Sequence, residues 1–242
     1  MSLMWNKFKE VLVVTVLSAT ALSCIGQSDN SRVIKREKMK VIYIMDPQCG
    51  WCYGNSSNIK SLYQEYGDKL EFELLVGGMW LGPNAPKGGE GLSGFLQTHA
   101  PRMSQTTGAQ VGQAYYDLAK DPSYTFSSLE PSAAIVAVRQ IAPDKLFEFV
   151  GLVQKALILD GKRLDKQETY QQIVEQLSID YSTFQKVWMT ESNVQETIQE
   201  FKRAGSMASG FPTLLVETAV GTHPLAAGYF DLNQMKSKLD SL

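Results

Sequence analysis

The sequence predicts an α/β protein in which two strand-containing halves flank a long helical block. Three observations carry this prediction. A strand, a helix and a second strand follow one another within residues 41–76. Apolar residues then recur at helical spacing for roughly 110 residues, and strand character returns at Thr213 before a last helix. With 242 residues, 44% of them apolar, the chain can build a sizeable core without disulfide bonds.

The first half opens with the apolar run 41–45, which is typical of a central strand buried on both faces. Asp46 and Pro47 interrupt it. A helix ending near Gly67 is predicted next, because apolar residues follow a helical period; they are Ile59, Leu62, Tyr63 and Tyr66. Residues 70–76 then alternate in polarity as a strand does. A parallel strand pair joined by the helix is the natural arrangement.

The tract 77–91 is rich in Gly and Pro and marks a boundary. Beyond it we expect helices, one of which lies between Pro143 and Gly161; its apolar face holds Leu146, Val150, Val153 and Leu157. Further helices are expected on the apolar sets around Ile173 and Phe184. Two capping-box patterns predict helix starts, at Asp165 with Glu168 and at Ser192 with Gln195.

The last part contains a predicted strand at 213–217, a short strand at 225–227, and a helix capped by Asp231. We therefore divide the chain into a strand-containing domain formed by residues 40–78 and 206–242, and a helical insertion formed by residues 79–205.

The first 24 residues resemble a secretory signal peptide, with Lys7 and Lys9 before a short apolar stretch. Cys24 stands where a bacterial lipoprotein would be cleaved and lipidated, which would anchor the protein to a membrane. Residues 25–39 are polar and form a predicted tether. These features predict a periplasmic or lipid-anchored protein. If translation starts at Met39 instead, the protein is cytoplasmic.

The overall charge argues against two classes of partner. The formal net charge is −2, so the sequence provides no electrostatic basis for binding nucleic acid or an anionic membrane surface.

The strongest motif is Cys49-Gly50-Trp51-Cys52, between the first strand and the first helix. At a helix N-terminus, free backbone N–H groups and the helix dipole favour a thiolate at Cys49 and lower its pKa. Such an accessible thiolate attacks a disulfide sulfur, and a second thiol resolves the mixed disulfide. We therefore expect Cys49 to attack and a buried Cys52 to resolve, with this redox-active pair serving in place of a separate cofactor.

Three other interpretations of the cysteine pair are weaker. A closed zinc site needs four ligands, and the only other Cys and His residues, Cys24, His99 and His223, are not suitably spaced. No metal is therefore expected. A purely structural disulfide across so short a loop would add little stability. A coincidental pair of core cysteines does not explain the strand–CxxC–helix context.

A second motif, Gly210-Phe211-Pro212-Thr213, heads the third predicted strand. Proline cannot donate to a sheet ladder, so it belongs at the first residue of a strand. Together with the stretch from Asp46 to Gly54 and the helical insertion, this motif resembles the DsbA superfamily, and is most similar to its FrnE-like branch. The resemblance covers roughly residues 40–242.

This resemblance implies a thioredoxin fold interrupted by a large α-helical insertion, with the proline loop packed in cis against the redox pair. It implies that Cys49 is the nucleophile, Cys52 the resolving thiol and Pro212 the cis-proline, and that the backbone of Phe211 faces substrate. This chain departs from strongly oxidising members, which have Pro-His between the cysteines. Gly50 and Trp51 lack that imidazole, so oxidase, isomerase and reductase all remain open.

The predicted function is thiol–disulfide exchange with cysteine-containing client proteins, with glutathione or a redox-recycling partner as a further reactant. Trp51 and Gly50 are candidates for substrate contact beside Cys49, and the segment 77–80 is a weaker one. Two alternatives stay open: a glutathione-dependent transferase or isomerase of the kappa-class and hydroxychromene-carboxylate isomerase type, and a non-catalytic chaperone-like binding module. His99 and His223 are expected to be ordinary surface residues, although His99 could line a groove.

Overall fold

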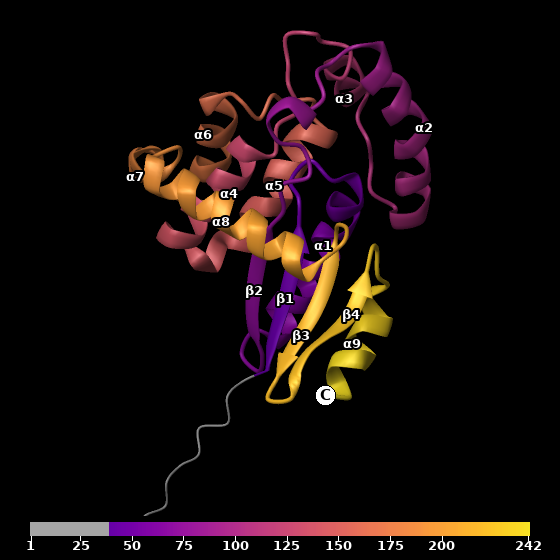
Figure 1. Ribbon diagram of the computed structural model, residues 1–242, viewed down its shortest axis with the longest axis vertical. Coiled ribbons are helices and arrows are strands. Elements are labelled where there is room, and N and C mark those ends of the chain that lie inside the picture. Colours follow the sequence, from indigo (N-terminus) through magenta and orange to yellow (C-terminus); the bar gives the residue numbers. More distant parts are fainter. Residues whose placement is uncertain (1–38) are drawn as a thin grey trace, which may run out of the picture. The chain divides into compact units, whose positions relative to one another are not determined.

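The computed structural model describes residues 39–242, in which a four-stranded sheet is surrounded by helices (Figure 1). The sheet order is β2-β1-β3-β4. β1 is parallel to β2 and antiparallel to β3, and β3 is antiparallel to β4. The strands are β1 (Lys40–Met45), β2 (Glu71–Val76), β3 (Thr213–Thr218) and β4 (Gly221–Ala227). The predicted parallel pair is thus confirmed, and β4 begins earlier than the predicted strand 225–227.

Helix α1 connects β1 to β2, and the helices of the insertion lie between β2 and β3 in the sequence. Helix α1 is formed by Gly50–Tyr66, and the C-terminal helix α9 by Leu232–Asp240. The helices of the insertion are α2 (Glu90–Thr107), α3 (Gln113–Leu118), α4 (Leu129–Ile141), α5 (Leu146–Ile158), α6 (Gln167–Gln176), α7 (Tyr181–Val187) and α8 (Glu191–Met207). The predicted fold class, a thioredoxin-like α/β fold with a helical insertion, is confirmed.

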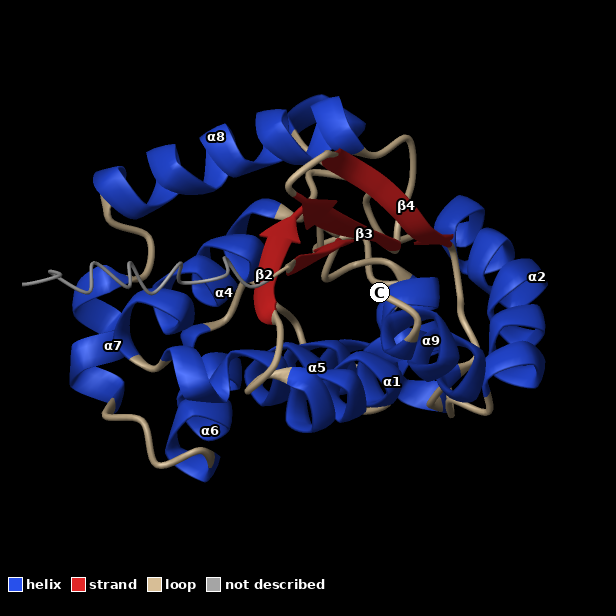
Figure 2. Ribbon diagram, turned by 90° about the horizontal axis from the view of Figure 1, so that it is seen from below, coloured by secondary structure: helices blue, strands red, loops and turns tan. Residues whose placement is uncertain are grey.

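β1 is buried on both faces, as its continuous apolar sequence predicts. Val41, Tyr43 and Met45 belong to the main core, which contains the buried face of α1. Ile42 and Ile44 belong to a second cluster on the other face, where Ala204 of α8 packs. Figure 2 shows α8 over one face of the sheet and α1 and α5 across the other. This central strand leads directly into the cysteine motif.

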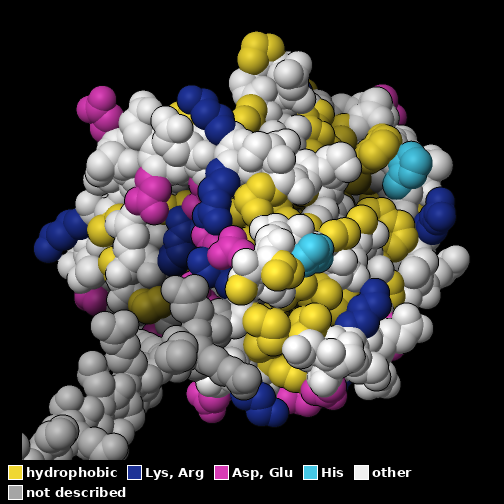
Figure 3. Space-filling model, turned by 60° about the horizontal axis from the view of Figure 1, so that its bottom comes forward, with side chains coloured by type: hydrophobic (Ala, Val, Ile, Leu, Met, Phe, Trp, Pro, Cys, Tyr) yellow, Lys and Arg dark blue, Asp and Glu magenta, His cyan; other side chains and the backbone are white. Residues whose placement is uncertain are grey.

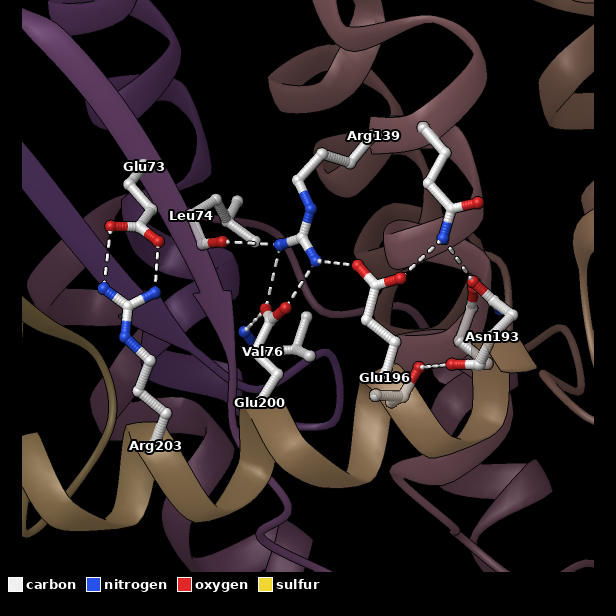
Figure 4. Close-up of polar contacts among 11 residues, drawn as sticks. Glu73, Leu74, Val76, Arg139, Asn193, Glu196, Glu200 and Arg203 are labelled. Atoms are coloured by element: carbon white, nitrogen blue, oxygen red, sulfur yellow. Dashed lines mark hydrogen bonds and ion pairs between the residues drawn. The ribbon is translucent and has the colours of Figure 1, made fainter. Parts of the chain in front are cut away.

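The edge of β2 is covered by charged side chains from the insertion (Figure 4). Glu200 of α8 accepts a hydrogen bond from the Val76 N–H at 2.6 Å, and Arg139 of α4 donates to the Leu74 carbonyl at 3.0 Å. Arg139 and Glu200 are also paired with each other. Unpaired strand edges can recruit other chains, and here side chains take the place of a neighbouring strand.

Both capping-box predictions were wrong. Asp165 does not cap α6, which starts at Gln167 after Lys166, because its carboxylate is paired with Arg163 at 2.7 Å. The cap of α8 is Thr190, whose hydroxyl accepts the Asn193 N–H, so Ser192 lies inside the first turn.

The predicted cap of the last helix is confirmed. The side chain of Asp231 accepts a hydrogen bond from the Gln234 N–H at 2.9 Å. α9 therefore starts where the sequence predicts.

The predicted signal peptide, Cys24 and the tether up to residue 38 lie outside the described residues, so export and lipidation stay predictions. Within residues 39–242, no helix has both the length and the apolar character needed to cross a membrane. On the face drawn in Figure 3, basic and acidic side chains are interspersed. That face therefore carries no extended field of a single sign.

Candidate active site

A tight turn formed by residues 46–49 positions Cys49 between β1 and α1. The Asp46 carbonyl accepts the Cys49 N–H at 3.0 Å, and the Asp46 carboxylate accepts the Gln48 N–H at 2.8 Å. Aspartate at the first position of such a turn and proline at the second are both favoured, since Asp accepts local N–H bonds and Pro presets its φ angle. The sequence Asp46-Pro47 thus ends β1 and directs the chain into α1.

Cys49 is the N-cap of α1, where its sulfur meets backbone groups from two segments. The Cys52 N–H donates to Cys49 Sγ at 3.3 Å, and the Cys49 thiol donates to the Phe211 carbonyl at 3.5 Å. Both cysteines are free thiols. Cys49 is more enclosed than the sequence suggested, since only 6% of it is exposed. Cys49 also lines the pocket described below.

Cys52 lies one turn into α1 and is fully buried. Burial, together with the neighbouring Cys49, raises the pKa of the Cys52 thiol well above its ordinary value. The expected asymmetry is thus present in the geometry: Cys49 lies at the helix end, and Cys52 is enclosed and protonated.

The proline loop lies against the cysteine pair. The Phe211–Pro212 peptide bond is cis, as the resemblance implies, and Pro212 is buried just before β3. Phe211 packs so tightly over Gly77 that a Cβ on that glycine would lie 2.2 Å from the Phe211 ring. Any side chain at residue 77 would therefore displace the Phe211 ring, which accounts for one of the glycines in the boundary tract.

Asp46 ties the cysteine turn to two loops of the insertion. It is fully buried, and its carboxylate accepts hydrogen bonds from the Met79 N–H at 2.8 Å and the Ser128 hydroxyl at 3.0 Å, besides Gln48. Ser128 in turn accepts the Trp80 N–H at 3.1 Å. One carboxylate therefore positions the loop after β2 and the start of α4 around the cysteines.

This carboxylate predicts a pH dependence of stability. Burial raises the pKa of Asp46 from 3.8 to about 6, against the opposing effect of its three hydrogen bonds. The folded state therefore holds this proton more tightly than the unfolded state, so the contribution is most favourable below pH 4 and is lost as pH rises through 6. Relative to Asp46→Asn, whose amide does not titrate, the unfolding free energy of the wild type should fall by about 2 kcal/mol between pH 4 and 7. Urea denaturation at several pH values measures this, and a pH-independent difference between the two proteins would contradict it.

A pocket of about 200 Å³ opens beside Cys49. Of the sequence candidates, Gly50 and Trp51 line it, and so do Met79 and Trp80 from segment 77–80 and His99 from α2. Phe211 and Pro212 lie on the proline loop, and His223 is exposed on β4. The sequence analysis missed Gln48, Phe95, Met103 and Tyr115, which also line this pocket. The spacing of Phe95, His99 and Met103 puts them on one face of α2, and this is a sequence signal that links the α2 residues of the pocket.

Within residues 39–242, no three His, Cys, Asp or Glu side chains gather in a way that could hold a metal ion.

Solved structures of similar shape include disulfide enzymes. A candidate protein disulfide isomerase from Nitrosomonas europaea shares 25% identity with a TM-score of 0.75, covering 85% of this chain and 97% of that one. The cytosolic disulfide reductase DsbM from Pseudomonas aeruginosa, solved with GSH, shares 25% identity with a TM-score of 0.68, covering 84% and 98%. A 2-hydroxychromene-2-carboxylate isomerase, at 15% identity and a TM-score of 0.57, covers 84% and 95% and shares the fold alone.

No curated protein matches the chain in sequence. A family model described as thioredoxin, however, matches residues 42–220, from β1 to beyond β3. Since this match spans most of the chain, the protein belongs to the thioredoxin family, and the similar structures share its fold over 84–85% of its length.

Proposed function

We propose that this protein catalyses thiol–disulfide exchange with cysteines of client proteins through Cys49 and Cys52. The observation that carries this proposal is the asymmetric environment of the two sulfurs. Cys49 Sγ lies at the N-terminus of α1, where it accepts a hydrogen bond from the Cys52 N–H. Cys52 lies directly behind it, protonated and shielded from solvent.

In the reductive direction, the Cys49 thiolate attacks one sulfur of a client disulfide. A mixed disulfide forms and the other client sulfur leaves as a thiolate. Cys52 then loses its proton and attacks Cys49 Sγ, which releases the second client thiolate and leaves a Cys49–Cys52 disulfide. Two electrons pass to the client. The reverse sequence oxidises a client dithiol, and the reduction potential of the pair decides which direction prevails.

Equilibration of the protein with a glutathione redox buffer measures the reduction potential of the cysteine pair, and this potential shows which direction prevails. A potential of about −120 mV would indicate an oxidase, one of about −180 mV would indicate an isomerase, and one of about −270 mV would indicate a reductase. Insulin reduction and oxidation of reduced ribonuclease test whether the pair acts on proteins at all. A protein that suppresses aggregation but catalyses neither reaction would instead be a binding module. Conjugation of glutathione to small electrophiles would indicate the transferase or isomerase alternative.

A further inference from the structure

The pocket beside Cys49 is assembled from separate parts of the chain, which include α1, the loop after β2, α2, α3 and α5. The start of α1 contributes Trp51, the loop after β2 contributes Trp80, and α2 contributes Phe95 and Met103. Phe95 is half exposed at the rim, and its ring lies 4.4 Å from that of His99, measured between centroids. The redox-pair helix and the insertion therefore enclose the space in front of the sulfur together.

The size and polarity of the pocket limit what can occupy it. Among residues 39–242, no Lys, Arg, Asp or Glu side chain lines it. Its volume of about 200 Å³ exceeds the roughly 150 Å³ in which an apolar cavity binds benzene, but lies below the roughly 300–1,000 Å³ of typical small-molecule sites. One aromatic ring fits this space, and among the described residues the lining offers no Lys or Arg side chain to the two carboxylates of glutathione.

We propose that this pocket binds an aromatic side chain next to the reacting cysteine of the client. This inference rests on the proposed function and names its substrate class: protein disulfides in which a cysteine is flanked by an aromatic residue. The enclosure of Cys49 agrees with it, because a client sulfur reaches Cys49 only together with the residue that enters the pocket.

The test uses disulfide-bonded peptides that differ only in the residue before or after the cysteine, either Phe or Glu. We expect kcat/KM for the Phe peptide to exceed that for the Glu peptide about tenfold or more at one of these positions, which corresponds to about 1.4 kcal/mol. Phe95→Lys, at the half-exposed rim, should reduce the preference below about threefold, since it brings a cation to an apolar site. Val220→Lys is the matched control and should keep the preference. Val220 is 86% exposed between β3 and β4, at the end of the sheet remote from α2 (Figure 1).

The outcomes separate this inference from the function on which it rests. If no peptide reacts, the proposed function fails. Equal rates for Phe and Glu peptides, or an unchanged preference in Phe95→Lys, would overturn the aromatic pocket while leaving the exchange activity intact. Glutathione disulfide reacting faster than every peptide would also overturn it, in favour of a glutathione site.

Discussion

Replacing Cys49 with serine should reduce thiol–disulfide exchange to the uncatalysed rate. A serine hydroxyl forms no disulfide, and Cys52 cannot substitute for Cys49 because it is fully buried and its pKa is raised. The measurement is insulin reduction and ribonuclease oxidation by Cys49→Ser beside the wild type. The fold should persist, since serine retains an oxygen that can accept the Cys52 N–H at the start of α1.

Cys52→Ser is the matched control, because it changes the same atom type one helical turn away. It should retain the first attack and then stall, so that the client stays attached to Cys49 as a mixed disulfide. A non-reducing gel or intact-mass measurement would show the adduct, and dithiothreitol would release it. Full turnover by Cys49→Ser, or an adduct on Cys52 in that variant, would reverse the assigned roles.

Glu200→Ala should lower the unfolding free energy by about 3 kcal/mol, at the lower end of the range for breaking a buried ion pair. The Glu200 side chain is 7% exposed, and its removal leaves the Val76 N–H without its acceptor and Arg139 without its most buried partner. Because Arg139 is 25% exposed, water solvates part of its charge once Glu200 is removed. We therefore expect a loss of unfolding free energy at the lower end of that range. Urea denaturation of the full chain measures the effect.

Glu196→Ala provides the comparison for this site, since Glu196 lies on the same helix and pairs with the same arginine at 3.3 Å. Its side chain is 49% exposed, and exposed pairs contribute about 1 kcal/mol or less. Equal losses in the two variants would contradict the view that burial makes the Glu200 pair important. Neither residue lies near the cysteines in the sequence or lines their pocket.

The regular elements could be predicted because their signals are local. The apolar run of β1 and the cap at Asp231 each depend on a few neighbouring residues. The two capping boxes failed for a different reason. Asp165 and Ser192 each have a neighbour that competes, Arg163 for the carboxylate and Thr190 for the cap position. Which neighbour prevails depends on tertiary geometry that a short pattern does not contain.

The same distinction applies to the active site. The cysteine pair and the proline motif are visible because their chemistry needs particular residues at particular spacings. The pocket is not visible, since ordinary apolar residues form most of it and only folding brings Phe95 and Tyr115 to Cys49. The role of the buried Asp46 is only partly visible in the sequence. A turn role was apparent from Pro47, but its bonds to Met79 and Ser128 join distant segments.

The topology of the sheet also affects how the chain is made. One edge of β1 pairs with β2, which is close to it in the sequence. The other edge pairs with β3, which is distant in the sequence; Val41, for example, lies opposite Val216. During synthesis, the whole helical insertion emerges before β3 does. Until then, the most apolar strand keeps an unpaired edge, which can associate with other nascent chains. A chain truncated before Thr213 would contain both cysteines and still be prone to aggregate, so the last segment protects the sheet that carries the redox pair.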